Sequence, residues 1–163
     1  MMLNNLQTIL YVIALLLLLN LQIHAENPNA PTNLIIEVAR NDKYVIVVDD
    51  AHPTFGWVMN DPDKNEFQTA YQILVASSRG NLENENGDMW NSGKVQNNES
   101  TNVPYGKNGM KLQSGKMYFW KVRIWDKDGN TSPYSSIGRF IKSLNLSDWT
   151  AKPIWDISNK FNE

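Results

Sequence analysis

Residues 118–126 of this 163-residue chain, YFWKVRIWD, are the clearest indication of its fold. These residues alternate between two sets, which are Tyr118, Trp120, Val122 and Ile124 on one side and Phe119, Lys121, Arg123 and Trp125 on the other. A period of two places such sets on opposite faces of a β-strand. The residues DKDG at 126–129 have the composition of a turn. The stretch therefore predicts a strand and a turn within a small all-β domain, and no catalytic site is needed to explain it.

Shorter segments of the same β-branched and aromatic character recur along the chain, and polar or Gly- and Pro-containing turns separate them. The longest candidate strand is residues 67–78, in which Tyr71, Ile73 and Val75 share one face. Residues 79–87 are rich in Asn and Glu and predict a loop, and no segment after the N-terminus shows a helical period. The other candidates are residues 32–38, 44–48, 54–59, 88–95, 101–105 and 137–142, the last with Phe140 inward. About seven short strands predict a two-sheet β-sandwich.

The N-terminus carries an uninterrupted apolar run, ILYVIALLLLL, at residues 9–19. A helix that spans a bilayer needs about 20 such residues. A secretory signal peptide has a shorter apolar core followed by a small residue before the cleavage site, and Ala25 fits that position. We therefore expect residues 1–25 to be a signal peptide and the protein to be secreted or periplasmic. An uncleaved N-terminal membrane anchor is the alternative.

The residues after Ala25 amount to one domain's worth of chain. The chain has no Cys, which excludes disulfides, a thiolate metal site and a cysteine nucleophile. Its formal net charge of −2 gives no electrostatic reason to expect nucleic acid as a partner. We expect residues 26–31 to form an extended leader and residues 32–143 the sandwich. Residues 144–163 differ in composition and look like the start of a linker to a further domain.

The sequence suggests no catalytic residue, no cofactor site and no metal site. His52 stands alone after residue 25, which argues against a zinc site or a His-based acid–base pair. Acidic residues cluster in two turns, at 61–66 and 126–130. The first turn lacks the Gly and the distal Glu of a helix–loop–helix calcium site, so we interpret its acids as solvated turn charges. For the second, a hairpin turn is favoured over weak Ca²⁺ binding.

Aromatic residues are numerous, and we divide them into two groups. Core positions are predicted for Trp57, Tyr71, Tyr118 and Trp120. Contact with a neighbouring domain or with a sugar is predicted for Trp90, Phe119, Trp125, Trp149 and Trp155. Within the second group, Phe119 and Trp125 share one face of their strand, and an aromatic face can stack on a sugar ring. Interdomain packing is the preferred interpretation, and local packing and sugar binding are the alternatives.

Several motifs, taken together and in order, resemble one known family. Residues 67–78, FQTAYQILVASS, are similar to its QTAYQI-V-S signature, and residues 89–95, MWNSGKV, are similar to its WDSGKV. Residues 118–126 resemble its YYWRVRVWD, and Leu112 and Tyr118 have the six-residue spacing of the tyrosine corner. Residues 148–151, DWTA, look like its junction to a following domain. The family is the N-terminal immunoglobulin or fibronectin type III-like domain of bacterial α-L-rhamnosidases, glycoside hydrolase family 78.

The resemblance covers residues 30–155 and implies a non-catalytic function. It implies a parent enzyme that removes terminal α-L-rhamnose with inversion, using carboxylates in a helical barrel that this chain lacks. The chain itself would be a non-catalytic accessory domain whose partners are the downstream domains. A carbohydrate-binding module for rhamnose-containing plant polysaccharide and a cell-surface adhesion module are the alternatives. Two features depart from the family pattern: Asn91 replaces its usual Asp, and residues 152–155 are not the usual lead-in.

Overall fold

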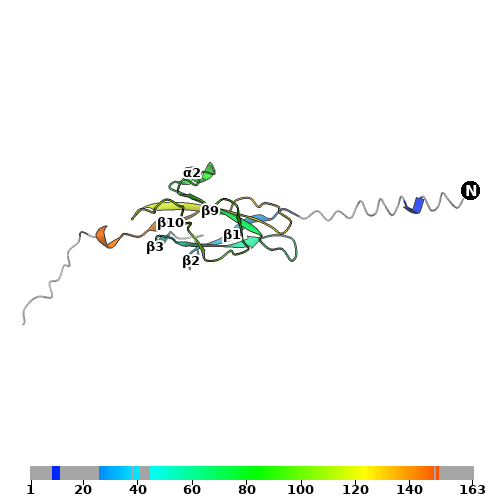
Figure 1. Ribbon diagram of the computed structural model, residues 1–163, viewed down its shortest axis with the longest axis horizontal. Coiled ribbons are helices and arrows are strands. Elements are labelled where there is room, and N and C mark those ends of the chain that lie inside the picture. The colour runs from blue at the N-terminus through cyan, green and yellow to red at the C-terminus, as the bar shows by residue number, and fades with distance from the viewer. Residues whose placement is uncertain (1–8, 12–25, 38, 41–44, 149, 151–163) are drawn as a thin grey trace, which may run out of the picture.

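The computed structural model describes residues 9–11, 26–37, 39–40, 45–148 and 150. Two facing β-sheets form the body, and a short helix lies on the outer side of one of them (Figure 1). The described residues contain ten strands, where the sequence predicted about seven. Four of the ten are only two residues long, which is too short to show a pattern in the sequence. The described part of the chain contains no helix with the length and apolar character that crossing a bilayer requires. The predicted all-β sandwich is confirmed.

The first sheet has the strand order β2 (Ala39–Arg40), β1 (Asn29–Ile36), β4 (Thr54–Asn60) and β8 (Val103–Pro104), and all its pairs are antiparallel. Phe55 and Trp57 of β4 lie in the core and are each 1% exposed. The sandwich begins earlier than predicted, because β1 starts at Asn29 within the expected leader. Pairing between Asn29 and Asn60 at the far end of β4 extends β1 beyond Thr32.

The second sheet has the order β3 (Ile46–Val48), β10 (Gly138–Lys142), β9 (Met117–Trp125), β5 (Ala70–Ala76) and β6 (Trp90–Asn91), and β7 (Val95–Gln96) also pairs with β5. β9, the strand from which the fold was inferred, is longer than β5, which was predicted to be the longest. Its predicted core face, Tyr118 to Ile124, is buried. β3 runs parallel to β10, so the chain changes sheets between β2 and β3.

The core between the sheets is rich in aromatic rings. It contains Trp57, Tyr71, Tyr118 and Trp120, which confirms their predicted assignment, and also Phe140. Trp57 Nε1 donates to Gln68 Oε1 at 2.8 Å, and the Gln68 amide donates to two backbone carbonyl oxygens. The Tyr118 hydroxyl accepts a 2.7 Å hydrogen bond from the backbone N–H of Gln113, as the tyrosine-corner spacing predicts. These buried polar groups therefore avoid the cost of being desolvated without a partner.

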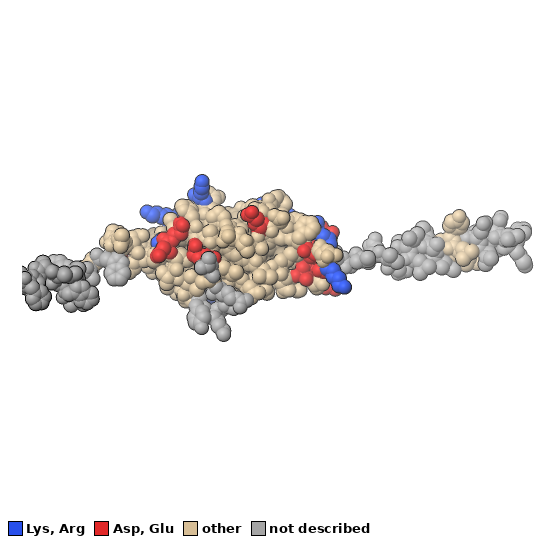
Figure 2. All heavy atoms as spheres, turned by 90° about the horizontal axis from the view of Figure 1, so that it is seen from below, with Lys and Arg blue, Asp and Glu red and all other residues tan. Residues whose placement is uncertain are grey.

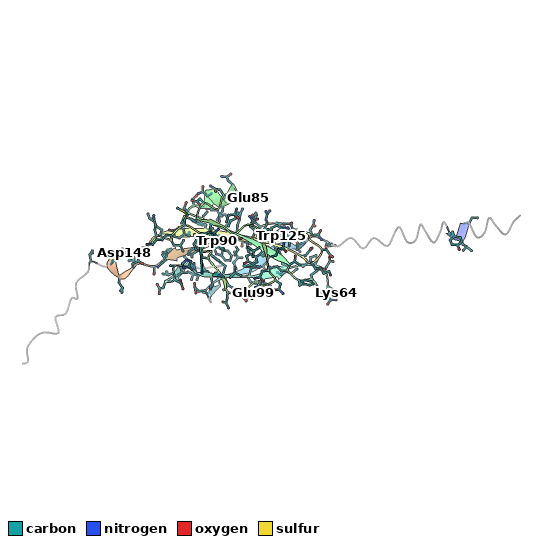
Figure 3. All side chains as sticks on the ribbon, in the orientation of Figure 1. Lys64, Glu85, Trp90, Glu99, Trp125 and Asp148 are labelled. Atoms are coloured by element: carbon teal, nitrogen blue, oxygen red, sulfur yellow. The ribbon has the colours of Figure 1, made fainter. Side chains whose placement is uncertain are left out.

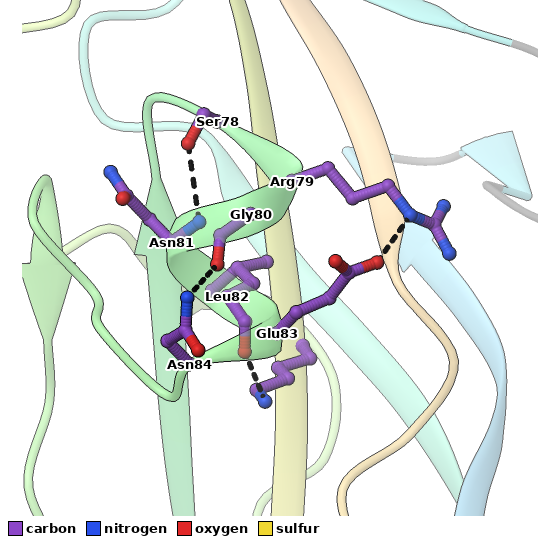
Figure 4. A network of polar contacts seen from close by, with 8 residues as sticks. Ser78, Arg79, Gly80, Asn81, Leu82, Glu83 and Asn84 are labelled. Carbon is purple, nitrogen blue, oxygen red and sulfur yellow. Dashed lines mark hydrogen bonds and ion pairs between the residues drawn. The ribbon is translucent and has the colours of Figure 1, made fainter.

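The predicted loop after β5 instead contains an α-helix, α2 (Arg79–Glu83). Ser78 caps its N-terminus, because the Ser78 hydroxyl accepts a hydrogen bond of 3.2 Å from the N–H of Asn81 (Figure 4). At the other end, Lys121 Nζ donates to the carbonyl oxygen of Leu82 at 2.6 Å. A helix of five residues is too short to display a period of 3.6 in the sequence, and this is why pattern analysis missed it.

Helix α2 covers the outer face of the second sheet. Leu82 is fully buried and packs with Leu74 and Ala76 of β5. Burial lowers the pKa of Lys121, whose Nζ lies 4.3 Å from the centre of the Tyr134 ring. Both faces of β5 are therefore largely buried, one in the main core and the other under α2.

Candidate docking surface

Trp90, the first of the predicted contact aromatics, lies in the core and not on a surface. It is 7% exposed. The loop after β8 lies directly on its ring, since a Cβ added at Gly106 would stand 2.3 Å from Trp90 Nε1. The same Nε1 donates to Asn108 Oδ1 at 3.1 Å. The predicted surface role is wrong for Trp90, because a loop distant in the sequence covers it. Trp149 and Trp155 lie outside the described residues.

Phe119 and Trp125 lie on the outer side of β9, and both rings have partners within the domain. Phe119 is partly buried against the cluster under α2. Trp125 is 9% exposed, with Lys94 Nζ 4.5 Å and the Arg123 guanidinium carbon 5.2 Å from its ring centre. A cation over an indole face is attracted by the electron-rich ring. Local packing, one of the alternatives from the sequence, accounts for both side chains.

Exposed apolar side chains gather at the end of the sandwich from which the chain leaves toward residue 150. Figure 3 labels Asp148 at this end, next to the 3-10 helix η1 (Leu146–Asp148). The most exposed are Met110 at 62%, Met117 at 39%, Leu144 at 52% and Leu146 at 91%. We call Met110, Lys111, Lys116, Met117, Leu144 and Leu146 the exit surface. Contiguous exposed apolar patches on soluble proteins mark interaction sites.

The exit surface is hollowed in two places. An open pocket of about 440 Å³ has Met110, Lys111, Lys116 and Met117 on its walls and Asp88 among its lining residues. A second hollow of about 420 Å³ continues across Met110 and Lys111 to Asn145. The surface therefore combines apolar hollows with two exposed lysines, which suits a partner that offers apolar side chains flanked by carboxylates.

The loop that carries Met110 is held from below. The Tyr105 hydroxyl lies 2.9 Å from the carbonyl oxygen of Met89 and 2.8 Å from that of Met110, and the two acceptors share its single proton. Burial raises the pKa of Tyr105 to about 12, so the hydroxyl keeps its proton at ordinary pH. A Cβ at Gly109 would stand 2.5 Å from the Tyr105 ring, so the loop lies against that ring. These contacts hold the backbone of Met110 in place within the exit surface.

Two carboxylates at this end are already occupied by hydrogen bonds. Asp88 accepts from the Ser77 hydroxyl at 2.5 Å and from the Ser77 N–H at 2.9 Å. Burial opposes the ionisation of Asp88, but the bonds from Ser77 outweigh it and its pKa is lowered. Asp148 accepts from the Ser114 hydroxyl and from the N–H of Asn145, and the bond from Ser114 is the main cause of its lowered pKa. The two bonds to Asp148 tie η1 to the sandwich and set where the chain leaves it.

The exit surface has no clear signature in the sequence. Met110 and Met117 stand in a segment that the pattern treats only as the approach to β9. One weak signal exists, because Met117 precedes the core residue Tyr118 and the period of two therefore turns it away from the core. The loop after β8 and η1 supply the side chains around Met117. A local sequence pattern does not show that these segments lie together.

Comparisons with known proteins show that this chain is similar to part of α-L-rhamnosidases. The family profile described as the Rha78A-like, N-terminal immunoglobulin domain matches residues 31–144. An α-L-rhamnosidase of Formosa agariphila is 37% identical over 105 residues, which are 64% of this chain and 11% of that protein. An α-L-rhamnosidase of Streptomyces avermitilis is 41% identical over 106 residues, which are 64% of this chain and 10% of that protein.

A solved structure shows the same likeness in three dimensions. The α-L-rhamnosidase from Dictyoglumus thermophilum matches with a TM-score of 0.70 and 39% sequence identity, covering 76% of this chain and 13% of that one. The chain thus spans about a tenth of the length of the curated relatives it matches.

Proposed function

Because the chain belongs to the family of Rha78A-like N-terminal immunoglobulin domains, we propose that it is a non-catalytic accessory domain of an α-L-rhamnosidase. In this proposal its task is to brace the domain that follows it in such enzymes. The relatives support it, since the match takes up about a tenth of each of them and the rest of their length lies outside it. Hydrolysis of terminal α-L-rhamnose is then the work of those other parts.

The observation that carries the proposal is the position of the exit surface. Its members Leu144 and Leu146 stand where the family match ends, at residue 144. A domain that follows in the same polypeptide would therefore lie next to Met110 and Met117. Covering these four apolar side chains would remove them from water, and the apolar area buried would favour docking by about 25 cal/mol per Å². The exposed Lys111 and Lys116 would pair with acidic groups at the rim of the contact.

A hybrid enzyme tests the proposal. The full domain replaces the matching segment of the Streptomyces avermitilis α-L-rhamnosidase, with and without the double change Met110→Lys and Met117→Lys. We expect the double variant to inactivate about 2–5 °C below the unchanged hybrid, because two charges would be placed in an apolar contact. The matched control is Val47→Lys with Val58→Lys, two apolar residues that are also exposed but lie outside the exit surface. Equal heat inactivation of all three hybrids would contradict docking through the exit surface.

For rhamnose-containing polysaccharide, we propose that the parent enzyme and not this domain is the binding partner. Support comes from Phe119 and Trp125, whose rings have partners within the domain. Titration of the full chain with rhamnose or rhamnogalacturonan should release no heat of binding in a calorimeter. A saturable heat would favour the carbohydrate-binding alternative.

We also propose that the chain is exported and cut after Ala25. The apolar run at residues 9–19 supports this. So does Glu26, whose backbone nitrogen donates to Asp63 Oδ2 at 2.9 Å and thus already belongs to the folded body. N-terminal sequencing of the protein from its host should start at Glu26. A start at Met1 would indicate an uncleaved membrane anchor.

A further inference from the structure

Two acidic turns that are far apart in the sequence meet at the end of the sandwich opposite the exit surface. Asp61 and Glu66 come from the turn after β4, and Asp126 follows β9 directly. One carboxylate oxygen from each of the three lies within 4.8 Å of the other two. Figure 3 labels Lys64 of the first turn at this end and Asp148 at the other, and Figure 2 shows acidic and basic side chains side by side at its right-hand end. We call Asp61, Glu66 and Asp126 the acidic triad.

The carboxylates of the acidic triad are held in place but incompletely satisfied. Asp126 is 1% exposed and accepts from the N–H and the side-chain amide of Asn130 at 2.7 and 2.9 Å. Asp61 Oδ1 accepts from the N–H of Asp63 at 2.9 Å. Its other oxygen, Oδ2, and Glu66 Oε2 are both buried and have no hydrogen-bond partner. The Glu66 side chain is only 5% exposed. Burying an anionic oxygen without a partner costs free energy, and a further positive group beside the acidic triad would reduce that cost.

Lys127 supplies one positive charge, and one is too few. Its Nζ lies 2.5 Å from Glu66 Oε1, and its side chain is 34% exposed. Lys127 contacts only Oε1 of Glu66, and Oε2 of the same carboxylate has no partner. Three carboxylates against one ammonium leave this cluster with a negative balance.

We propose that Asp61, Glu66 and Asp126 bind one calcium ion, which joins the turn after β4 to the turn after β9. The ligand atoms are all carboxylate oxygens, which hard cations prefer. Calcium–oxygen bonds measure 2.3–2.6 Å, so two oxygens on opposite sides of one ion stand about 4.6–5.2 Å apart. The separation within the acidic triad allows all three to reach a single ion. Calcium accepts irregular shells of six to eight oxygens, whereas magnesium demands a near-perfect octahedron and retains several waters.

This site goes beyond the bracing function and does not depend on it. It also departs from the expectation that the chain holds no metal ligand. Neither turn alone contains a full ligand set. From the sequence, the first is interpreted as solvated turn charge and the second as a hairpin turn, with weak Ca²⁺ binding as the alternative. Tertiary structure brings them together, because the β4–β5 turn and the end of β9 lie at the same end of the sandwich. The bound ion would clamp that end.

Calcium titration of the full chain tests the proposal. After treatment with EDTA and removal of the chelator, calorimetry with CaCl₂ should show one site with a dissociation constant on the order of 10⁻⁴ M or tighter. The melting temperature should rise by roughly 5–10 °C at a hundredfold excess over that constant. MgCl₂ at the same concentration should raise it less. No heat and no shift would overturn the site, and an equal or larger effect of MgCl₂ would overturn the assignment to calcium.

Glu66→Gln is the decisive variant, because it keeps the shape of the side chain and removes its charge. We expect at least a tenfold weaker affinity for calcium. In EDTA the variant should unfold at or above the temperature of the unchanged chain, since the repulsion within the triad is reduced. This separates loss of the site from loss of the fold. The matched control is Glu83→Gln on the exposed side of α2, which should leave the affinity unchanged. Unchanged affinity in Glu66→Gln would overturn the proposal.

Discussion

The two ends of this sandwich are built on opposite principles. The exit surface leaves large apolar side chains in water, while the carboxylates at the same end, Asp88 and Asp148, have hydrogen-bond partners. At the other end Asp126 is buried, Asp61 and Glu66 are partly buried, and two carboxylate oxygens of the acidic triad are buried without a hydrogen-bond partner. An apolar surface without cover is relieved by another protein surface, whereas buried anions without partners are relieved by a cation. The unsatisfied groups of each end therefore indicate the chemical class of what binds there.

The largest expected effect comes from removing a buried aromatic ring beneath the exit end. Trp90→Ala removes the ring on which the loop after β8 lies, and it should lower the free energy of unfolding by about 3–5 kcal/mol, as for other buried Trp-to-Ala changes. Urea unfolding of the full chain in excess calcium measures this. Phe67→Ala is the control, because Phe67 is 54% exposed and its loss should cost less than about 0.5 kcal/mol. A cost below about 1 kcal/mol for Trp90→Ala would show that the loop does not depend on the ring.

A smaller effect is expected at the acidic end. Asp126→Ala removes the acceptor of two hydrogen bonds from Asn130 and leaves those donors unpaired, which should cost about 1–3 kcal/mol in EDTA. In calcium the gap to the unchanged chain should widen, because only the unchanged chain keeps its ligand set. Asp128→Ala, an exposed acid in the same turn, should change little in either condition. A variant more stable than the unchanged chain in EDTA would mean that repulsion within the triad outweighs the capping bonds.

The smallest effect concerns the pH response of the exit end. The folded-state pKa of Asp148 is lowered, so the bonds that tie η1 are fully present above the ordinary carboxyl range and are lost as pH falls through the lowered value. Ser114→Ala should move the pKa of Asp148 up toward its ordinary value, as followed by NMR titration. Asp88, whose lowered pKa depends on Ser77, serves as the internal control and should not move. An unchanged Asp148 would show that the Ser114 bond is not the cause.

Much of the fold could be predicted from local pattern. The alternation in β9, the tyrosine-corner spacing and the inward Phe140 are confirmed, because each depends on a period of two or on contacts near in sequence. Helix α2 was missed, since five residues carry no period and its stability comes from Ser78, Lys121 and the burial of Leu82. Trp90 was misplaced for a related reason: the loop that covers it follows another strand, and an aromatic residue looks the same in either setting.

A two-sheet sandwich with an aromatic core follows from the sequence alone, because hydrophobic periodicity and turn composition act over a few residues at a time. It also carried the motifs of the rhamnosidase domain family. Tertiary structure alone decided which side chains became surface and which became neighbours. The exit surface and the acidic triad both arise where segments from different strands arrive at one end of the sandwich, and such meetings depend on strand order and register across the whole fold.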